Sequence, residues 1–142
     1  MPSQAVSGYG TLLKRGDGGS PEVFSTMGEV KSISGPSMSV DEAEVTTHSS
    51  AASGAFREFR ATLIDAGEIE FEINYVPADS THVGLRNDLL NRTVRNFKIE
   101  LPGAIQTISF AAFVKQAPYE FPTDDVIKQK VTLRITGAPV WS

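Results

Sequence analysis

Residues Glu68-Ile69-Glu70-Phe71-Glu72-Ile73-Asn74-Tyr75 alternate strictly between polar and apolar side chains, and this stretch decides the fold class. Side chains along a β-strand point to opposite faces with a period of two, so the pattern predicts a half-buried strand. The core face is formed by the apolar positions Ile69, Phe71, Ile73 and Tyr75. The opposite face is formed by an acidic ladder, Glu68, Glu70 and Glu72.

Further strands are predicted on both sides of this stretch. Residues 8–15 and 23–33 read as a hairpin around a turn at residues 16–19, because glycine supplies the positive φ that tight turns need. Downstream, extended patterns predict three more strands, at residues 95–101, 105–115 and 128–136.

One helix is predicted after Pro77, which ends the acidic strand. Asp79 or Ser80 can cap it, since a side-chain oxygen there accepts a free backbone N–H, and the helix runs to about Asn91. Its expected buried stripe is Val83, Leu89 and Leu90. Six or seven strands and one helix predict a mainly β, single-domain chain: an antiparallel β-sandwich or barrel with one flanking α-helix.

Residues 35–55 are predicted to form a long extended loop. The segment holds Pro36, several serines and an acidic run at residues 41–44, and only residues 45–47 look like a strand. A long irregular segment within a compact domain is usually functional or mobile. Residues 56–64 then show helical spacing of apolar side chains, which predicts one or two turns of helix.

Composition excludes several function classes. The chain has no cysteine, so it has no disulfide or cysteine-based metal site, and its net charge of −4 is unfavourable for general nucleic-acid binding. The first residues lack a basic flank and an apolar run, and no stretch approaches the roughly 18 apolar residues of a membrane span. We therefore expect a soluble protein that is made in the cytoplasm and has no membrane partner.

Motifs that carry catalysis or bind metals are not found. His48 and His82 lie in separate segments without HExxH spacing, no serine sits in a GxSxG motif, and there is no Walker A sequence. Adjacent carboxylates such as Asp124 and Asp125 are usually solvated surface. We expect no catalytic residue, no metal and no cofactor.

Short segments spread over residues 8–140 resemble the lambda-type phage tail tube family in their order and spacing. The centre, residues 63–68, reads Leu-Ile-Asp-Ala-Gly-Glu, and the close, residues 131–139, reads Val-Thr-Leu-Arg-Ile-Thr-Gly-Ala-Pro. The other similar segments are residues 33–37, 44–48, 57–59, 71–72, 75–82, 95–97 and 110–114.

The resemblance implies a structural subunit of the virion tail, made in the bacterial host, and not an enzyme. In that family, six subunits join their sheets into a ring, and rings stack around a tape-measure protein between tail terminator and tail tip proteins. DNA then passes through the lumen without specific binding. The type VI secretion tube protein is implied to share this architecture.

Three segments are candidate sites within such a tube. The acidic ladder Glu68, Glu70 and Glu72 is either an ordinary solvent face or a lumen lining that repels DNA phosphates. The long loop is expected to reach the neighbouring ring through Asp41, Glu42, Glu44, Thr46, Thr47, His48, Ser49 and Ser50. Residues 1–7 are expected to form a flexible N-terminal arm.

Other functions stay open at this point. A type VI-like tube protein or a tail terminator also forms rings, although a terminator does not form long filaments. A small-ligand-binding barrel needs an interior cavity with convergent polar groups, whereas the core-facing residues here are bulky and apolar. A hydrolase needs a nucleophile paired with a base, and none is visible.

Overall fold

Strand β6 (Glu68–Asn74) occupies the stretch whose alternation predicts a strand. In the computed structural model, which describes residues 3–47, 54 and 56–142, Ile69, Phe71 and Ile73 are 0, 2 and 0% exposed. The glutamates of the acidic ladder lie on the opposite face, with Glu70 exposed. The period-two prediction is confirmed.

Eight strands form one antiparallel sheet in the order β2-β1-β7-β8-β10-β6-β3, with β9 paired to β10. Besides β6, these strands are β1 (Leu12–Gly16), β2 (Phe24–Thr26), β3 (Val30–Ser34), β7 (Arg95–Glu100), β8 (Thr107–Gln116), β9 (Tyr119–Glu120) and β10 (Lys128–Trp141). A short 3-10 turn at Pro102–Ala104 connects β7 to β8. The predicted mainly β, antiparallel class is therefore confirmed.

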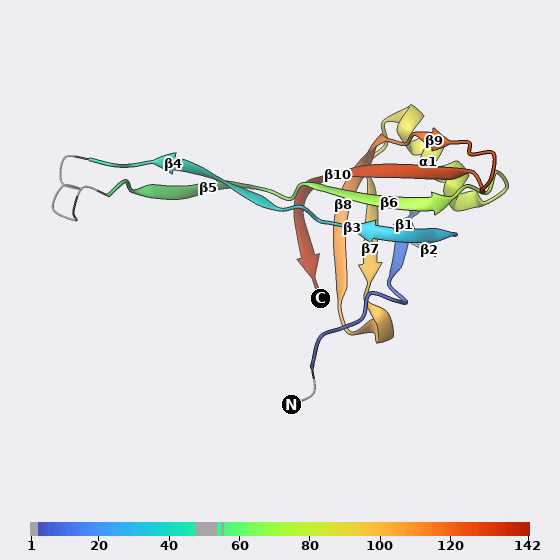
Figure 1. Cartoon of the computed structure of the whole chain (residues 1–142), viewed down its shortest axis with the longest axis horizontal. Helices are drawn as coiled ribbons and strands as arrows, with labels where there is room; N and C mark the ends of the chain where they lie inside the picture. The colour runs from blue at the N-terminus through green and yellow to red at the C-terminus, as the bar shows by residue number, and fades with distance from the viewer. Residues whose placement is uncertain (1–2, 48–53, 55) are drawn as a thin grey trace.

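Strand β10 folds the sheet back on itself. Its first half pairs with β6 from Lys128 to Arg134, and its second half pairs with β8 as far as Trp141. The register shifts twice along the β8 pairing, after Thr132 and after Thr136. As a result β10, β6 and β3 run across the view in Figure 1, whereas β1, β7 and β8 run down it. The two halves form crossed layers around one core, as in orthogonally packed sheets.

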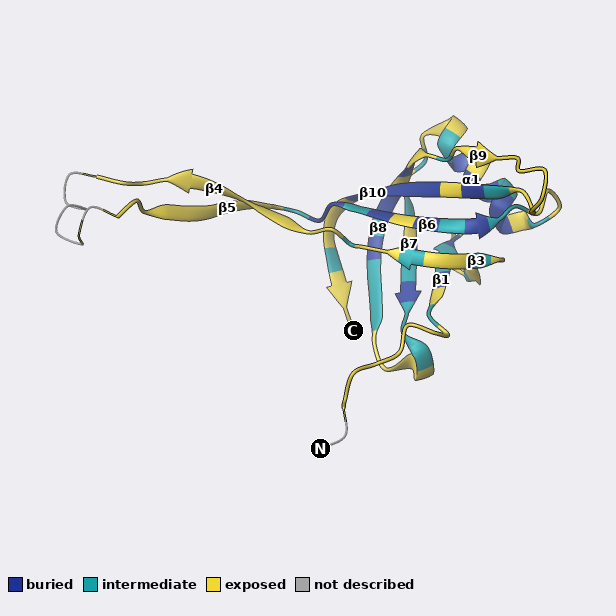
Figure 2. Ribbon diagram, in the orientation of Figure 1, coloured by how far each residue is buried: buried dark blue, intermediate teal, exposed yellow. Residues whose placement is uncertain are grey.

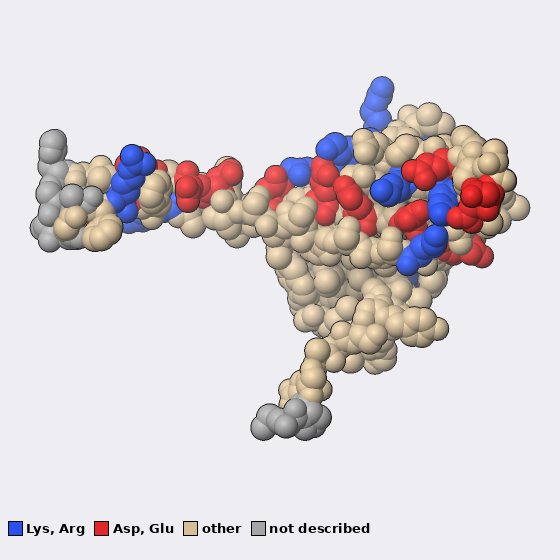
Figure 3. Space-filling model, viewed as in Figure 1, with Lys and Arg blue, Asp and Glu red and all other residues tan. Residues whose placement is uncertain are grey.

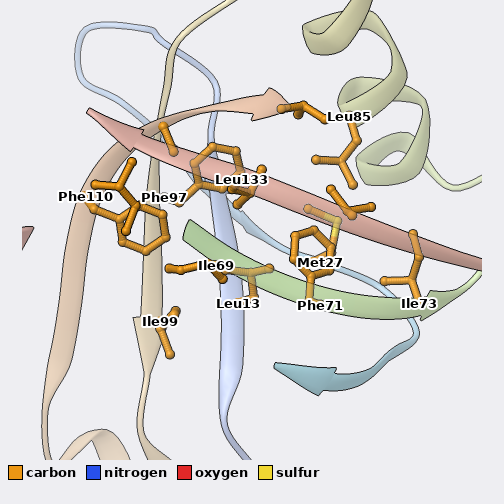
Figure 4. Close-up of a cluster of buried hydrophobic side chains, with 14 of the residues drawn as sticks. Leu13, Met27, Ile69, Phe71, Ile73, Leu85, Phe97, Ile99, Phe110 and Leu133 are labelled. Atoms are coloured by element: carbon orange, nitrogen blue, oxygen red, sulfur yellow. The ribbon is translucent and has the colours of Figure 1, made fainter. Parts of the chain in front are cut away.

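The core lies between these two layers (Figure 4). Phe97 and Phe110 stack with ring centroids 5.9 Å apart, and they face Ile69 and Leu133 of the other layer. Leu85 of the helix closes one side and is 1% exposed. Burying a side chain of this size contributes about 1.5–3 kcal/mol, so this apolar layer is the main source of stability.

Helix α1 (Ser80–Asn91) has the predicted bounds and cap. The carboxylate of Asp79 accepts a hydrogen bond from the Thr81 N–H at 2.8 Å. The Thr81 hydroxyl, and after it this N–H, hold the pKa of Asp79 below its usual value. The predicted buried stripe is wrong, because Leu90 is 70% exposed. The buried positions are instead Thr81, His82, Gly84, Leu85 and Asp88.

Two buried polar side chains hold the helix in this orientation. Asp88 is 2% exposed and accepts hydrogen bonds from Nε of Arg15 at 2.7 Å and from Nε of Arg95 at 3.0 Å. His82 accepts the Val76 N–H on Nδ1 and contacts the Gly28 carbonyl through Nε2. Because these partners satisfy each polar group, the helix turns a polar face inward.

Two predictions for residues 35–64 are wrong. Instead of a loop followed by helical turns, β4 (Ser39–Glu44) pairs with β5 (Phe59–Asp65) in a separate two-stranded sheet. The backbone hydrogen bonds of each strand are satisfied by the other, about twenty residues away, and local spacing carries no signal of that pairing. The chain also forms β9 between the strands predicted at residues 105–115 and 128–136, and β10 continues beyond residue 136.

No helix among the described residues has the length and apolar character that crossing a membrane requires.

Candidate assembly surfaces

The hairpin of β4 and β5 projects far from the rest of the chain (Figures 1 and 2). Every residue of β4 is exposed, and in β5 only Asp65 is partly covered. Large apolar side chains are nevertheless carried here: Val40, Phe59, Leu63 and Ile64 are 51, 50, 77 and 71% exposed. A two-stranded hairpin is marginally stable alone in water, and exposed apolar patches mark interaction sites. The hairpin therefore has the properties of a docking element.

The two faces of the hairpin differ in character. Glu42 is paired with Ala61 and Glu44 with Phe59, so these side chains share one face. Ala43 and Arg60 are paired on the other face. The register shifts between Val40 and Glu42, so the alternation is interrupted before Leu63 and Ile64.

Of the residues predicted for contact with a neighbouring ring, those that the structure describes lie on or just after β4. Asp41, Glu42 and Glu44 are exposed. The hydroxyl of Thr46 accepts the Glu58 N–H at 2.9 Å and so helps to pair the strands; Thr47 follows it. The remaining predicted residues, His48, Ser49 and Ser50, lie outside the described residues.

The base of the hairpin is tied to the body at Gly67. A Cβ added at this residue would lie 2.0 Å from the Ser37 carbonyl oxygen, and its φ is +81°, so glycine is required. The Gly67 carbonyl accepts the Ile135 N–H at 3.1 Å. Beside it, Asp65 forms an ion pair of 2.7 Å with Arg134. That guanidinium and the Gly67 N–H hold the pKa of Asp65 below its usual 3.8.

The acidic ladder lies on the outer face of the layer that contains β6, next to cations of neighbouring strands. Glu72 and Glu68 are the Cα partners of Lys130 and Arg134 in β10. Glu68 also forms an ion pair with Lys115 of β8. Figure 3 accordingly shows both signs of charge interspersed over this part of the body. The face is thus mixed in charge, and a ring built from it would carry paired charges instead of a purely acidic band.

The described residues give little support for a conventional active site. There, no group of three or more His, Asp or Glu side chains is arranged to hold a metal ion. The ring nitrogens of His82 are both occupied by backbone groups.

Sequence reasoning missed the exposed apolar side chains of the hairpin. Helical spacing predicts turns of helix for residues 56–64, whereas the structure places Leu63 and Ile64 in strand β5, where they are 77 and 71% exposed. Only the pairing with β4 reveals this arrangement, because three- and four-residue spacings fit a helix equally well.

A family model described as lambda phage tail tube protein matches residues 10–142. No curated protein matches the sequence. Among solved structures, the chain is similar to the tail of an empty gene transfer agent particle refined with C6 symmetry. The two chains are 18% identical with a TM-score of 0.79, and the match covers 97% of this chain and 99% of that chain.

Two further structures show the same fold. The SPP1 tail tube matches at 8% identity and a TM-score of 0.74, covering 97% of this chain and 79% of that chain. The sheath–tube complex of the extracellular contractile injection system PVC, in its extended state, matches at 16% identity and a TM-score of 0.74, covering 99% of this chain and 93% of that chain.

Proposed function

Because this chain belongs to the lambda phage tail tube protein family and is a structural component of a tail tube, we propose that six copies join into a ring and that the rings stack into the conduit for DNA ejection. The C6 symmetry of the similar gene transfer agent tail supports the ring number. Heterologous contacts form closed rings when the rotation closes and filaments when it does not, and a tube needs both.

The exposed β4–β5 hairpin is the observation that carries this proposal. Its apolar side chains gain nothing in a free subunit, where they are solvated. Removing Leu63 and Ile64 from water in an assembly stabilises that assembly by about 25 cal/mol per Å² of apolar surface. A second copy of the chain, in the same ring or the next, supplies that cover.

The passage of DNA requires a lumen that does not bind phosphates. The net charge of −4 suits this requirement. Glu68, Glu70 and Glu72 are our candidate lumen residues, although their cationic neighbours reduce the expected repulsion. Changing all three to Lys is expected to permit assembly and slow DNA release from particles, and unchanged release would remove them from the lumen.

The same role implies the remaining partners. We expect a tape-measure protein inside the growing tube, with tail terminator and tail tip proteins at its ends, and synthesis in the bacterial host before incorporation into the virion. The role is structural and requires no catalytic step.

The second candidate is a tube or terminator of a contractile injection system. The similarity to the PVC sheath–tube complex favours it, since the folds agree. A terminator forms single rings, whereas a tube protein forms long stacks.

Electron microscopy of the concentrated, purified chain tests the proposal. We expect tubes with a central hole and sixfold averages in end views. Replacing residues 41–62 by a short Gly–Ser turn should leave a folded subunit that forms no tubes. Tubes of normal length from this variant, or no rings from the intact chain, would contradict the proposal.

A further inference from the structure

A groove lies where the projecting hairpin meets the C-terminal half of β10. In Figure 1 the hairpin points to the left and the end of β10 runs down to the C-terminus, so the two meet at an angle. The groove has a volume of about 700 Å³. We call it the base groove and define it by five apolar side chains that line it: Met38, Leu63, Ile64, Phe113 and Trp141.

The base groove collects large apolar side chains that the subunit leaves in water. In the order just given, the five are 50, 77, 71, 37 and 42% exposed. Exposed apolar patches of this kind mark interaction sites. Trp141 is the only tryptophan of the chain, and tryptophan is enriched among the residues that dominate binding energy. The base groove therefore has the composition of a docking site, with Trp141 as its candidate anchor.

One wall of the base groove is the free edge of a strand. Consecutive residues 134–139 all line the groove, whereas a strand face would contribute alternate residues. Strand β6 pairs with β10 only as far as Arg134, and Ile135 then donates its N–H to the Gly67 carbonyl. From Thr136 to Trp141, β8 is the only partner of β10 among the described residues. Such an edge presents backbone N–H and C=O groups to another chain.

The backbone of Trp141 faces this free side. Ser142 and Thr107 exchange two backbone hydrogen bonds of 2.9 Å. Because hydrogen-bonded and non-hydrogen-bonded pairs alternate in an antiparallel ladder, the N–H and C=O of Trp141 point away from β8. Pro139 has no N–H, so this edge does not support a long continuous ladder, which limits indiscriminate pairing. The base groove thus fits a short extended segment that buries apolar side chains against Trp141.

A second copy of the chain is the occupant that the geometry favours. Leu63 and Ile64 line the base groove, and they also belong to the hairpin surface that a second copy covers under the proposed function. A segment that covers these two side chains lies against Phe113 and Trp141 as well, because all four line the same groove. The groove therefore continues the hairpin contact onto the body of the subunit.

We propose that an extended segment of a second copy docks in the base groove, buries Trp141 and pairs with the free edge of β10. This inference rests on the proposed function, which makes a second copy the partner of the hairpin, and it adds the end of β10 to that interface.

Tryptophan fluorescence of the unaltered chain tests the burial, because Trp141 is the only tryptophan. When tubes form, the emission should shift to shorter wavelength, and quenching by acrylamide should fall by about threefold or more, since anchor residues are fully desolvated. The backbone amide of Trp141 should gain protection from hydrogen exchange in the tubes, because it acquires a partner.

An indole that is as accessible in tubes as in the free subunit would overturn the inference and leave the proposed function standing. Shielding in complete particles but not in tubes of the purified chain would assign the groove to another tail protein and would equally overturn the inference. If the unaltered chain forms no rings or tubes, the proposed function falls and this inference falls with it.

Substitutions test the energy of the contact. Trp141→Ala and Phe113→Ala should each raise the critical concentration for tube formation by about tenfold or more. The matched control is Phe121→Ala, at an aromatic residue that is 71% exposed and lies outside the base groove; it should leave the critical concentration within about threefold of the original. Circular dichroism of each soluble variant checks that it is folded. An equal rise for Phe121→Ala would show that exposed aromatic side chains act in general, and would overturn the assignment to the groove.

Discussion

Replacing Leu63 and Ile64 by alanine tests whether the hairpin acts only after assembly. The two side chains are 77 and 71% exposed in the subunit, so about three-quarters of their surface is available for burial by a partner. Full burial of such a side chain contributes about 1.5–3 kcal/mol. Alanine retains a small part of that, so we expect each subunit contact to lose about 2–4 kcal/mol in total.

The expected effect on assembly is large, and the effect on the subunit is small. At about 1.4 kcal/mol for each tenfold change, the critical concentration should rise roughly 30- to 700-fold. The free energy of unfolding of the subunit should change by about 0.5 kcal/mol or less, because surface substitutions rarely do more. Sedimentation of tubes across a dilution series measures the first quantity, and urea unfolding of the soluble chain measures the second.

The matched control is Val23→Ala, at a residue that is 60% exposed on the connection between β1 and β2. It should alter neither quantity. A critical concentration within about threefold of the original, with the subunit still folded, would refute the reasoning that the hairpin is buried on assembly. A loss of more than about 1 kcal/mol in the soluble subunit would show that these side chains already stabilise it.

Three further predictions concern the subunit itself. Gly67→Ala should destabilise the subunit by about 1–3 kcal/mol or more in thermal unfolding, because the new Cβ meets the Ser37 carbonyl at 2.0 Å. Gly137→Ala is the control, since its φ is also positive, at +84°, but no other atom lies within 4 Å of an added Cβ. Asp88→Asn should cost roughly 3 kcal/mol in urea unfolding, because it leaves two guanidinium groups without their buried partner, and a loss below about 1 kcal/mol would contradict that role. The pKa of Asp65 is lowered, so its ion pair stabilises the hairpin base fully at pH values above the ordinary aspartate pKa of 3.8. This stabilisation is lost as the pH falls through the lowered pKa. The NMR shift of the Gly67 amide should follow this transition, and Asp65→Asn should abolish the transition.

The sequence predicts the body of the fold where a local pattern has one physical meaning. The alternation in residues 68–75 specifies β6 because a strand exposes and buries successive side chains. The start of α1 is equally local, since Asp79 caps the helix through a hydrogen bond to Thr81, two residues away. The ordered family segments likewise indicate a tail tube subunit from sequence alone.

The candidate surfaces depend on contacts between distant segments. Spacing predicts a helix at residues 56–64, yet β5 pairs with β4, and the pairing decides that Phe59 shares a face with Glu44. The inward face of α1 is likewise decided by Arg15, which lies 73 residues from its partner Asp88. A predicted apolar stripe fails there because a satisfied buried carboxylate outweighs one exposed leucine.

Sequence by itself therefore determined the fold class, the capped helix, the acidic ladder and the family resemblance, because each rests on neighbours along the chain. Tertiary structure alone decided that the segment expected to be a loop is a projecting hairpin, that the ladder is flanked by Lys130 and Arg134, and that Trp141 lines one groove with Leu63. The physical reason is that hydrogen bonding, ion pairing and burial are settled between residues that the folded chain brings together from far apart.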